Sequence, residues 1–261
     1  MVAESPPPVV PRPAATLLLL RDGADGLEVL MTSRHEAAGF AAGALVFPGG
    51  KVDAGDHALT ACCADRATLD EAALVLRIAA IRETFEECGI LLARAGGALL
   101  TAEALAALRR NHGTAEGGFA ALVAAARLEL ATGDLVPYAH WITPVDRPKR
   151  FDTHFFLAPA APSQVAVHDG REAVDAVWLT PQAVLAGADG GRIKLVFATR
   201  MNLMKLARST TVAAALAAAR SAPIVTVTPV IEKTSAGPFI HIPEAAGYGA
   251  TRVAAGDIPR A

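Results

Sequence analysis

The segment from Leu74 to Ile90, LVLRIAAIRETFEECGI, constrains the fold more than any other stretch of the chain. Successive residues of an α-helix are about 100° apart, so the bulky apolar side chains fall on one narrow stripe. That stripe comprises Leu74, Ile78, Ile81 and Phe85, and the opposite side carries Glu83, Glu86 and Glu87. Gly89 stands where a left-handed C-cap would end the helix. The pattern therefore predicts a helix over residues 71–88 that packs on one face and presents three carboxylates on the other.

The three carboxylates have two interpretations. A solvated acidic face is one, because runs of charged residues usually lie at the surface. A cation site is the other, because like charges three and four residues apart repel, and the last turn of a helix disfavours anions. Arg82 can offset one of these charges. A divalent ion such as Mg²⁺ or Mn²⁺ would offset all three, and such hard cations take oxygen ligands.

A second feature is the stretch VFPGGKVDAGD, residues 46–56. A short strand-like run stops at Pro48, which fixes its own φ and pushes Phe47 toward an extended conformation. Gly49 and Gly50 allow close approach of the backbone to a neighbouring group. The stretch is either a simple turn or a turn that places backbone groups against a metal ion or a phosphate.

Elsewhere the sequence predicts groups of strands with helices between them. A hairpin is expected over residues 17–32, a pair of strands in LVPYAHWITP and RFDTHFFLAPA, and later strands in DAVWLT, APIVTVTPVI and PFIHIP. Helices are expected within residues 98–132, at PQAVLAG and between residues 193 and 221. Strands and helices do not alternate regularly, which favours an α+β sandwich with a mixed sheet over a doubly wound fold.

Composition excludes several classes of protein. The net charge of the 261-residue chain is −2 and no block of like charge occurs, which argues against a broad nucleic-acid-binding surface. Alanine supplies much of the hydrophobicity, and the run TLLLL is too short to span a membrane. The N-terminal stretch lacks the features of a secretory signal, and the three cysteines show no C-x-x-C spacing. We therefore expect a reduced, cytoplasmic protein.

Two separate stretches resemble the halves of the Nudix box. RETFEECGI, residues 82–90, is similar to the second half, R-E-U-x-E-E-x-G-U with U aliphatic, and Thr84 replaces an aliphatic residue. GKVDAGD, residues 50–56, is similar to the first half, G-x5-E, with Asp56 in place of Glu. Residues 57–81 separate the halves, a much longer gap than usual. The interrupted box resembles the branch of Nudix hydrolases that includes the peroxisomal coenzyme A diphosphatase.

This resemblance implies a Nudix-type α/β/α sandwich and a set of site residues. The carbonyl of Gly49 and the carboxylates of Glu83, Glu86 and Glu87 would gather Mg²⁺ or Mn²⁺. Arg82 would orient the cluster by pairing with Asp56, so we expect these two residues to be close despite the insertion. Glu172, six residues before Trp178, would supply a further acid, although it is equally interpreted as a surface loop residue.

The implied reaction is hydrolysis of a nucleoside diphosphate joined to another group, in which a carboxylate orients or deprotonates water. Coenzyme A-cleaving members tend to carry L-L-T-x-R-(S/A)-x3-R-x3-G-x3-F-P-G-G, and residues 30–50 keep every spacing of this pattern. Met31, His35 and Gly39 depart from it. The resemblance therefore implies coenzyme A or acyl-coenzyme A as substrate, with substrate contacts from Arg34, Phe47, Gly50, Lys149 and Arg150. The three basic residues have a plainer interpretation as a strand-end arginine and a solvated basic turn.

Two alternatives to this function stay open. One is a hydrolase of ADP-ribose, NADH or another nucleoside diphosphate, and the other is a non-catalytic Nudix module that binds a nucleotide or a partner. A homodimer is compatible with all three functions. For the domain organisation we expect a disordered, proline-rich lead-in over residues 1–13, one domain over 14–245 and a tail over 246–261. Within the domain, the expected insertions are 57–72 and the helical 98–132, followed by a helical and strand extension over 190–245.

Overall fold

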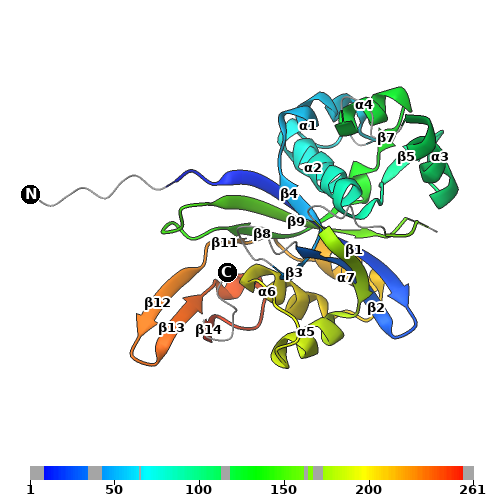
Figure 1. Cartoon of the computed structure of the whole chain (residues 1–261). Coiled ribbons are helices and arrows are strands. Elements are labelled where there is room, and N and C mark those ends of the chain that lie inside the picture. Colours follow the sequence, from blue (N-terminus) through cyan, green and yellow to red (C-terminus); the bar gives the residue numbers. More distant parts are fainter. Residues whose placement is uncertain are drawn as a thin grey trace, which may run out of the picture.

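The computed structural model describes residues 9–34, 43–64, 66–112, 118–161, 164–166 and 173–254. Within them, a mixed sheet of eight strands forms the centre of the fold, in the order β10-β2-β1-β9-β8-β11, with β3 on β2 and β4 on β1 (Figure 1). The strands are β1 (Arg12–Gly23), β2 (Gly26–Arg34), β3 (Leu45–Val46), β4 (Gly49–Lys51), β8 (Val136–Ile142), β9 (Phe151–Pro159), β10 (Ala173–Leu179) and β11 (Thr226–Val227). Most neighbours are antiparallel, whereas β1 pairs with β9 and β8 with β11 in parallel. The predicted α+β class with a mixed sheet is confirmed.

The central strand β1 explains the continuous run of leucines. It pairs with β9 along one edge and with β4 and β2 along the other. Leu17 and Leu19 pack into a hydrophobic cluster on one face of the sheet, and Leu18 and Leu20 into a second cluster on the other face. A strand covered on both faces reads as an unbroken apolar run, because neither alternate set of side chains meets water.

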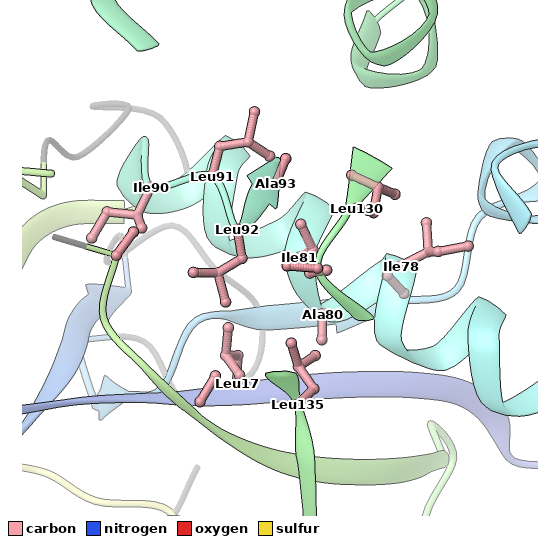
Figure 2. Packing of buried hydrophobic residues seen from close by; sticks show 14 of the residues in the cluster. Leu17, Ile78, Ala80, Ile81, Ile90, Leu91, Leu92, Ala93, Leu130 and Leu135 are labelled. Carbon is pink, nitrogen blue, oxygen red and sulfur yellow. The ribbon is translucent and has the colours of Figure 1, made fainter. Parts of the chain in front are cut away.

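Helices cover both faces of the sheet (Figure 1). The first cluster includes residues of α2 (Glu71–Cys88), and Figure 2 shows Ile78 and Ile81 of this helix on the side of β1 where Leu17 lies. The second cluster includes residues of α5 (Pro181–Asp189), α6 (Phe197–Leu206) and α7 (Val212–Ser221). The chain is thus an α/β/α sandwich, as the resemblance implied.

Helix α2 has the predicted bounds. The side chain of Asp70 caps its N-terminus by accepting a hydrogen bond from the Ala73 N–H, and Gly89 ends it in the left-handed conformation, with φ 68°. Its buried surface is wider than the predicted stripe, because Val75 and Ala79 are buried as well. Phe85 of the stripe meets Phe119 of α4 (Gly118–Ala125). Thr84 is fully buried, and its hydroxyl donates to the Ala80 carbonyl one turn earlier. A threonine at this usually aliphatic position therefore leaves no unpaired polar group.

The segment between the two half-boxes, for which we expected a loop or a short helix, contains little regular structure in its described residues. The end of α1 (Ala54–Ala58) and the 3-10 turn Thr60–Cys62 precede α2. Helix α1 begins three residues before the predicted insertion, because Asp53 caps it and forms a reciprocal capping box with Asp56. Asp56 therefore lies on a helix that belongs to the first half-box.

The insertion over residues 98–132 is not purely helical, which corrects the prediction. It contains α3 (Ala102–His112) and α4, but β6 (Ala98–Leu99) and β7 (Glu129–Leu130) flank them. These strands pair with β5 (Ala93–Ala95) in a small separate sheet. Strands of two or three residues are too short to show an alternation in sequence, so they were not predicted.

Both predicted terminal boundaries also need correction. Strand β1 begins at Arg12, and Arg150 Nη1 donates to the Val9 carbonyl at 2.7 Å, so residues 9–13 are not a free lead-in. At the other end, β14 (Arg252–Ala254) pairs with β13 (Gly237–His241), which pairs with β12 (Val230–Thr234). Part of the predicted tail is therefore a strand of a third sheet. None of the described helices combines the length and the apolar character needed to cross a bilayer.

Tyr248 lies near the start of the predicted tail, and its side chain packs in the second hydrophobic cluster. It is 2% exposed, and its hydroxyl accepts from Trp141 Nε1 at 2.8 Å and donates to Asn202 Oδ1 at 2.9 Å. Tyr248→Phe should lower the free energy of unfolding by about 1–3 kcal/mol, because it leaves a buried donor and a buried acceptor without this partner. Urea unfolding followed by fluorescence measures the loss. An unchanged midpoint would show that residues 246–254 do not contribute to the folded core.

Candidate active site

The two glycines that follow Pro48 bring the sheet and helix α2 together. Gly49 and Gly50 pair with Thr16 and Ala15 of β1. A Cβ atom at Gly49 would lie 2.5 Å from the Ala15 carbonyl oxygen, and one at Gly50 would lie 2.4–2.7 Å from the carboxylate atoms of Glu83. Both distances are far below normal contact, so any side chain at either position would displace its neighbour. The turn is therefore more than a change of chain direction, because it lets the backbone approach β1 and the Glu83 carboxylate closely.

Glu87 lies beside the same turn. It is 9% exposed, and its Oε2 accepts a hydrogen bond from the Gly49 N–H at 3.2 Å. Glu83 is also mostly covered, with 13% of its side chain exposed, whereas the Glu86 side chain is 46% exposed. The interpretation as a solvated acidic face fits only Glu86. A carboxylate is costly to bury without compensation, so the positions of Glu83 and Glu87 require neighbouring donors or cations.

Asp56 and Arg82 are in direct contact, which confirms the expectation that the halves of the box meet despite the insertion. Arg82 Nε donates to Asp56 Oδ1 at 2.8 Å and Arg82 Nη2 donates to Oδ2 at 3.0 Å. Asp56 is fully buried, and its Oδ2 also accepts from the Asp53 N–H at 2.8 Å. Because α1 positions Asp56 beside α2, this aspartate forms a bidentate salt bridge with the Arg82 guanidinium even though its side chain is shorter than that of glutamate.

The remaining donors of Arg82 hold the acidic face. Nη1 donates to Glu83 Oε1 at 2.9 Å and to Glu86 Oε2 at 3.0 Å, and Nη2 donates to the Lys51 carbonyl at 2.8 Å. Burial alone would lower the pKa of Arg82, but the hydrogen bond to Asp56 and the charges of Glu83 and Asp56 outweigh it and raise the pKa above its ordinary value. The guanidinium thus stays charged and offsets the repulsion between the neighbouring glutamates.

The three glutamates do not converge on one point. Glu83 and Glu86 accept hydrogen bonds from Arg82 Nη1, whereas Glu87 accepts one from the Gly49 N–H. The donor set still fits a hard divalent cation, since it offers carboxylate oxygens beside a glycine that leaves room for them. The contact that Gly49 makes here is through its N–H, so coordination by its carbonyl stays a prediction.

Two predicted substrate contacts are not supported by the positions of their side chains. Phe47 is 3% exposed and packs in the second cluster, on the face of the sheet opposite α2. Arg150 is 8% exposed, and its guanidinium donates to the carbonyls of Thr143 and Val9. Phe47 is therefore a core residue and Arg150 a structural one. The sequence pattern around Pro48 showed an extended chain but not which face of the sheet Phe47 would meet.

The other predicted contacts stay predictions. Lys149 is exposed on the turn between β8 and β9, in a position open to a ligand. Arg34 is the last residue of β2, and its side chain is not among those described. Glu172 lies outside the described residues.

Sequence reasoning missed two parts of this site. Asp53 caps α1 and donates its N–H to Asp56, and the Lys51 carbonyl accepts from Arg82. The first had a readable signal, because an acidic residue followed three positions later by another is a variant of the capping box. The second had none, since a backbone carbonyl carries no sequence signature.

Gly50→Ala tests the close approach of strand and carboxylate. The new methyl group would occupy the space of the Glu83 carboxylate, and Arg82 limits where that carboxylate can go. We expect turnover to fall by about tenfold or more, with a smaller effect on melting temperature, because a displacement of about 1 Å at a reacting group already costs this much. Gly55→Ala in α1 is the matched control, since its added Cβ would lie 3.4 Å from the nearest atom. Equal activities of the two variants would contradict the account of Gly50.

Comparisons with known proteins identify the family of the chain. A family model described as the NUDT19 Nudix domain matches residues 60–196. The acyl-coenzyme A diphosphatase NUDT19 of Xenopus laevis is 26% identical over 204 residues, which cover 60% of this chain and 54% of the relative. The chain thus spans about half the length of the curated relative that it matches.

A solved structure supports the fold over most of the chain. The crystal structure of a Nudix hydrolase from Alicyclobacillus acidocaldarius superposes with a TM-score of 0.68 and 29% identity, covering 82% of this chain and 99% of that one. The family model spans more than half of the chain and contains Arg82, Glu83, Glu86 and Glu87. The chain is therefore a Nudix hydrolase and belongs to the family described by the NUDT19 Nudix domain.

Proposed function

We propose that this Nudix hydrolase cleaves the diphosphate bond of coenzyme A or acyl-coenzyme A, giving 3′,5′-ADP and (acyl-)phosphopantetheine, with Mg²⁺ or Mn²⁺ as its cofactor. Nudix enzymes in general use divalent metals and act on nucleoside diphosphates. The observation that carries the proposal is the contact of Glu83 and Glu87 with the Gly49–Gly50 turn. It places two mostly buried carboxylates where the sheet leaves room for them.

The residues of the chain have distinct roles in this proposal. Glu83, Glu86 and Glu87 would hold the divalent ion, and Arg82 fixes the directions of Glu83 and Glu86 through Nη1. Asp56 in turn fixes Arg82 with two hydrogen bonds, so it is a positioning residue. When bound, the divalent ion would neutralise diphosphate charge and lower the pKa of water. A glutamate that is not fully engaged by Arg82 can then accept a proton from the attacking water.

The substrate assignment rests on two observations. Residues 30–50 keep the spacing of the coenzyme A pattern, and the matched relative is named as an acyl-coenzyme A diphosphatase. In the structure, Ser33 of β2 pairs with Leu45 of β3, and β3 leads within three residues to Gly49. The backbone of Arg34 is therefore next to the residue that pairs with the start of β3, and β3 leads to the Gly-Gly turn. Arg34 is our candidate for binding the 3′-phosphate that distinguishes coenzyme A from other nucleoside diphosphates.

Arg34→Ala should weaken hydrolysis of coenzyme A far more than that of 3′-dephospho-coenzyme A. A charge-assisted contact to phosphate contributes roughly 1.5–3 kcal/mol, which corresponds to about a 10- to 150-fold loss in kcat/KM. The experiment compares four rates, two enzymes with two substrates. Arg220→Ala, an exposed arginine on α7 in the opposite layer, is the control and should change neither rate. Equal losses on both substrates would show that Arg34 does not bind the 3′-phosphate.

A panel of diphosphates tests the function as a whole. We expect the highest kcat/KM with coenzyme A or an acyl-coenzyme A in the presence of Mg²⁺ or Mn²⁺, and no turnover with a chelator. Preference for ADP-ribose or NADH would replace the substrate and keep the reaction class. Tight binding of a nucleotide with no hydrolysis under any metal would show a binding module instead.

A further inference from the structure

A second group of ligand-type side chains lies on the sheet, outside the Nudix box. His140 of β8 and His154 of β9 are register partners, and Asp152 precedes His154 by two residues on the same strand. Residues at alternate positions of a strand point to the same face, so all three side chains share one face of the sheet. One ring nitrogen of each histidine and one carboxylate oxygen of Asp152 all lie within 4.8 Å of one another.

The three side chains converge on one carboxylate oxygen. His140 Nε2 contacts Asp152 Oδ1, and His154 Nε2 lies 3.7 Å from the same oxygen. The two imidazole rings stack, with centroids 4.1 Å apart and an interplanar angle of 18°. Two ring nitrogens and a carboxylate therefore point toward a common volume, and none of the three residues is fully exposed.

The frame around this group is rigid and supplies a supporting contact. Both histidines lie on paired strands rather than loops, and His140 Nδ1 is 2.8 Å from Thr226 Oγ1 of β11. A partner on the second ring nitrogen fixes the orientation of the ring, which is the arrangement that metal-binding histidines need. Strand-borne ligands with such support hold their geometry better than ligands on loops.

This group is separate from the carboxylates of the Nudix box. Ala15 of β1 pairs with Gly50 of β4 on one side and with His154 of β9 on the other. The central strand β1 therefore lies between the two groups. Adjacent strands are about 4.8 Å apart, which places the backbones of Gly50 and His154 about 10 Å apart. The two groups of side chains have no residue in common.

We propose that His140, Asp152 and His154 form a binding site for a divalent transition-metal ion of the Zn²⁺ class. Imidazole nitrogens suit Zn²⁺ and similar ions, whereas the all-oxygen donors of the Nudix box suit Mg²⁺ or Mn²⁺. Three protein ligands leave a further position for water, which is the arrangement of an open Zn²⁺ site. The chain would then carry two divalent sites that differ in ligand chemistry.

Charged groups around His154 affect how tightly this site would bind a metal ion. Burial and the neighbouring His140 lower the pKa of His154, which favours the neutral imidazole that a metal ion requires. Arg77 of α2 acts in the same direction on this pKa, and its guanidinium lies over the Phe156 ring, 5.1 Å from the centroid. A fixed cation nearby also opposes a second positive charge, so we expect a weaker site than one with four protein ligands.

Calorimetric titration of the full chain with Zn²⁺ at saturating Mg²⁺ tests the proposal without reference to hydrolysis. The double substitution His140→Gln with His154→Gln should lose one equivalent of bound Zn²⁺. Two controls should keep it: His241→Gln, which alters a histidine of β13 that pairs with Glu232, and Glu87→Gln, which alters the Nudix box. Loss of the same equivalent in Glu87→Gln, or none in the double variant, would overturn the proposal. Absence of Zn²⁺ binding by the wild type would do so too.

A second measurement keeps the test decisive if the double variant does not fold. Zn²⁺ should raise the melting temperature of the wild type by mass action, and Asp152→Asn or His154→Gln alone should reduce that rise. Circular dichroism confirms that each single variant is folded. An equal Zn²⁺-dependent rise in the wild type and both variants would show that the ion binds elsewhere. This result would leave the proposed diphosphatase function untouched, since the two sites have different ligands.

Discussion

Replacing Glu87 by glutamine should lower kcat by at least about 100-fold and leave the protein folded, because the substitution removes a ligand charge from the proposed divalent-ion site. Glutamine has the same shape, and its amide oxygen can still accept from the Gly49 N–H as Oε2 of Glu87 does. Relief of repulsion among the glutamates should leave the melting temperature unchanged or raise it slightly. Activity and melting temperature are measured on the same preparation.

Glu71→Gln is the matched control for this experiment. Glu71 is in the first turn of the same helix, and its side chain is 73% exposed. The control should retain normal turnover, since it removes an equal charge from α2 at a distance from the Gly-Gly turn. Wild-type turnover in Glu87→Gln would remove this residue from the site and leave the proposed metal site without the most buried of its three glutamates.

The substitution Asp56→Ala should lower the free energy of unfolding by about 3–5 kcal/mol. The Asp56 side chain is fully buried, and the Arg82 side chain is only 12% exposed. Removing the carboxylate leaves the mostly buried Arg82 guanidinium without its bidentate partner. The Asp53 N–H also loses its hydrogen-bond acceptor. Breaking one side of such an ion pair costs far more than the pair itself contributes, because the remaining charge stays desolvated.

Denaturant unfolding at equilibrium measures this loss, with Asp53→Ala as the comparison. Asp53 is the capping residue of the same short helix, and removal of a helix cap typically costs about 1 kcal/mol. The difference between the two variants isolates the contact between the half-boxes from the stability of α1. If Asp56→Ala were no more destabilised than Asp53→Ala, the ion pair across the insertion would not be a structural element of the site.

The parts of the fold that sequence reasoning predicted are those with a local signal. Helix α2 shows its apolar stripe and its terminal glycine within one window, and the hairpin of β1 and β2 shows two apolar runs around a short turn. The contact of Asp56 with Arg82 was also predictable, because both ends of the insertion carry half of one motif. Each of these features has its signal in one or two short stretches of the sequence.

The parts that were missed depend on contacts between distant segments. Tyr248 looks like a tail residue until Trp141 and Asn202 are brought to it by the second cluster. The pairing of His154 with His140 depends on the register of β8 and β9. A register shift between Pro137 and Ala139 alters that register and has no sequence signature. Arg150 likewise resembles a free basic residue until Val9 folds back to it.

The products formed from coenzyme A test the central claim most directly. Wild-type protein is incubated with coenzyme A and Mg²⁺ or Mn²⁺, in parallel with Glu87→Gln and with a chelator, and the products are separated and identified by mass. We expect 3′,5′-ADP and phosphopantetheine in equal amounts from the wild type alone, because the proposed reaction breaks the bond between the two linked phosphates. Intact coenzyme A in every sample, or a product that has lost only its 3′-phosphate, would contradict the account.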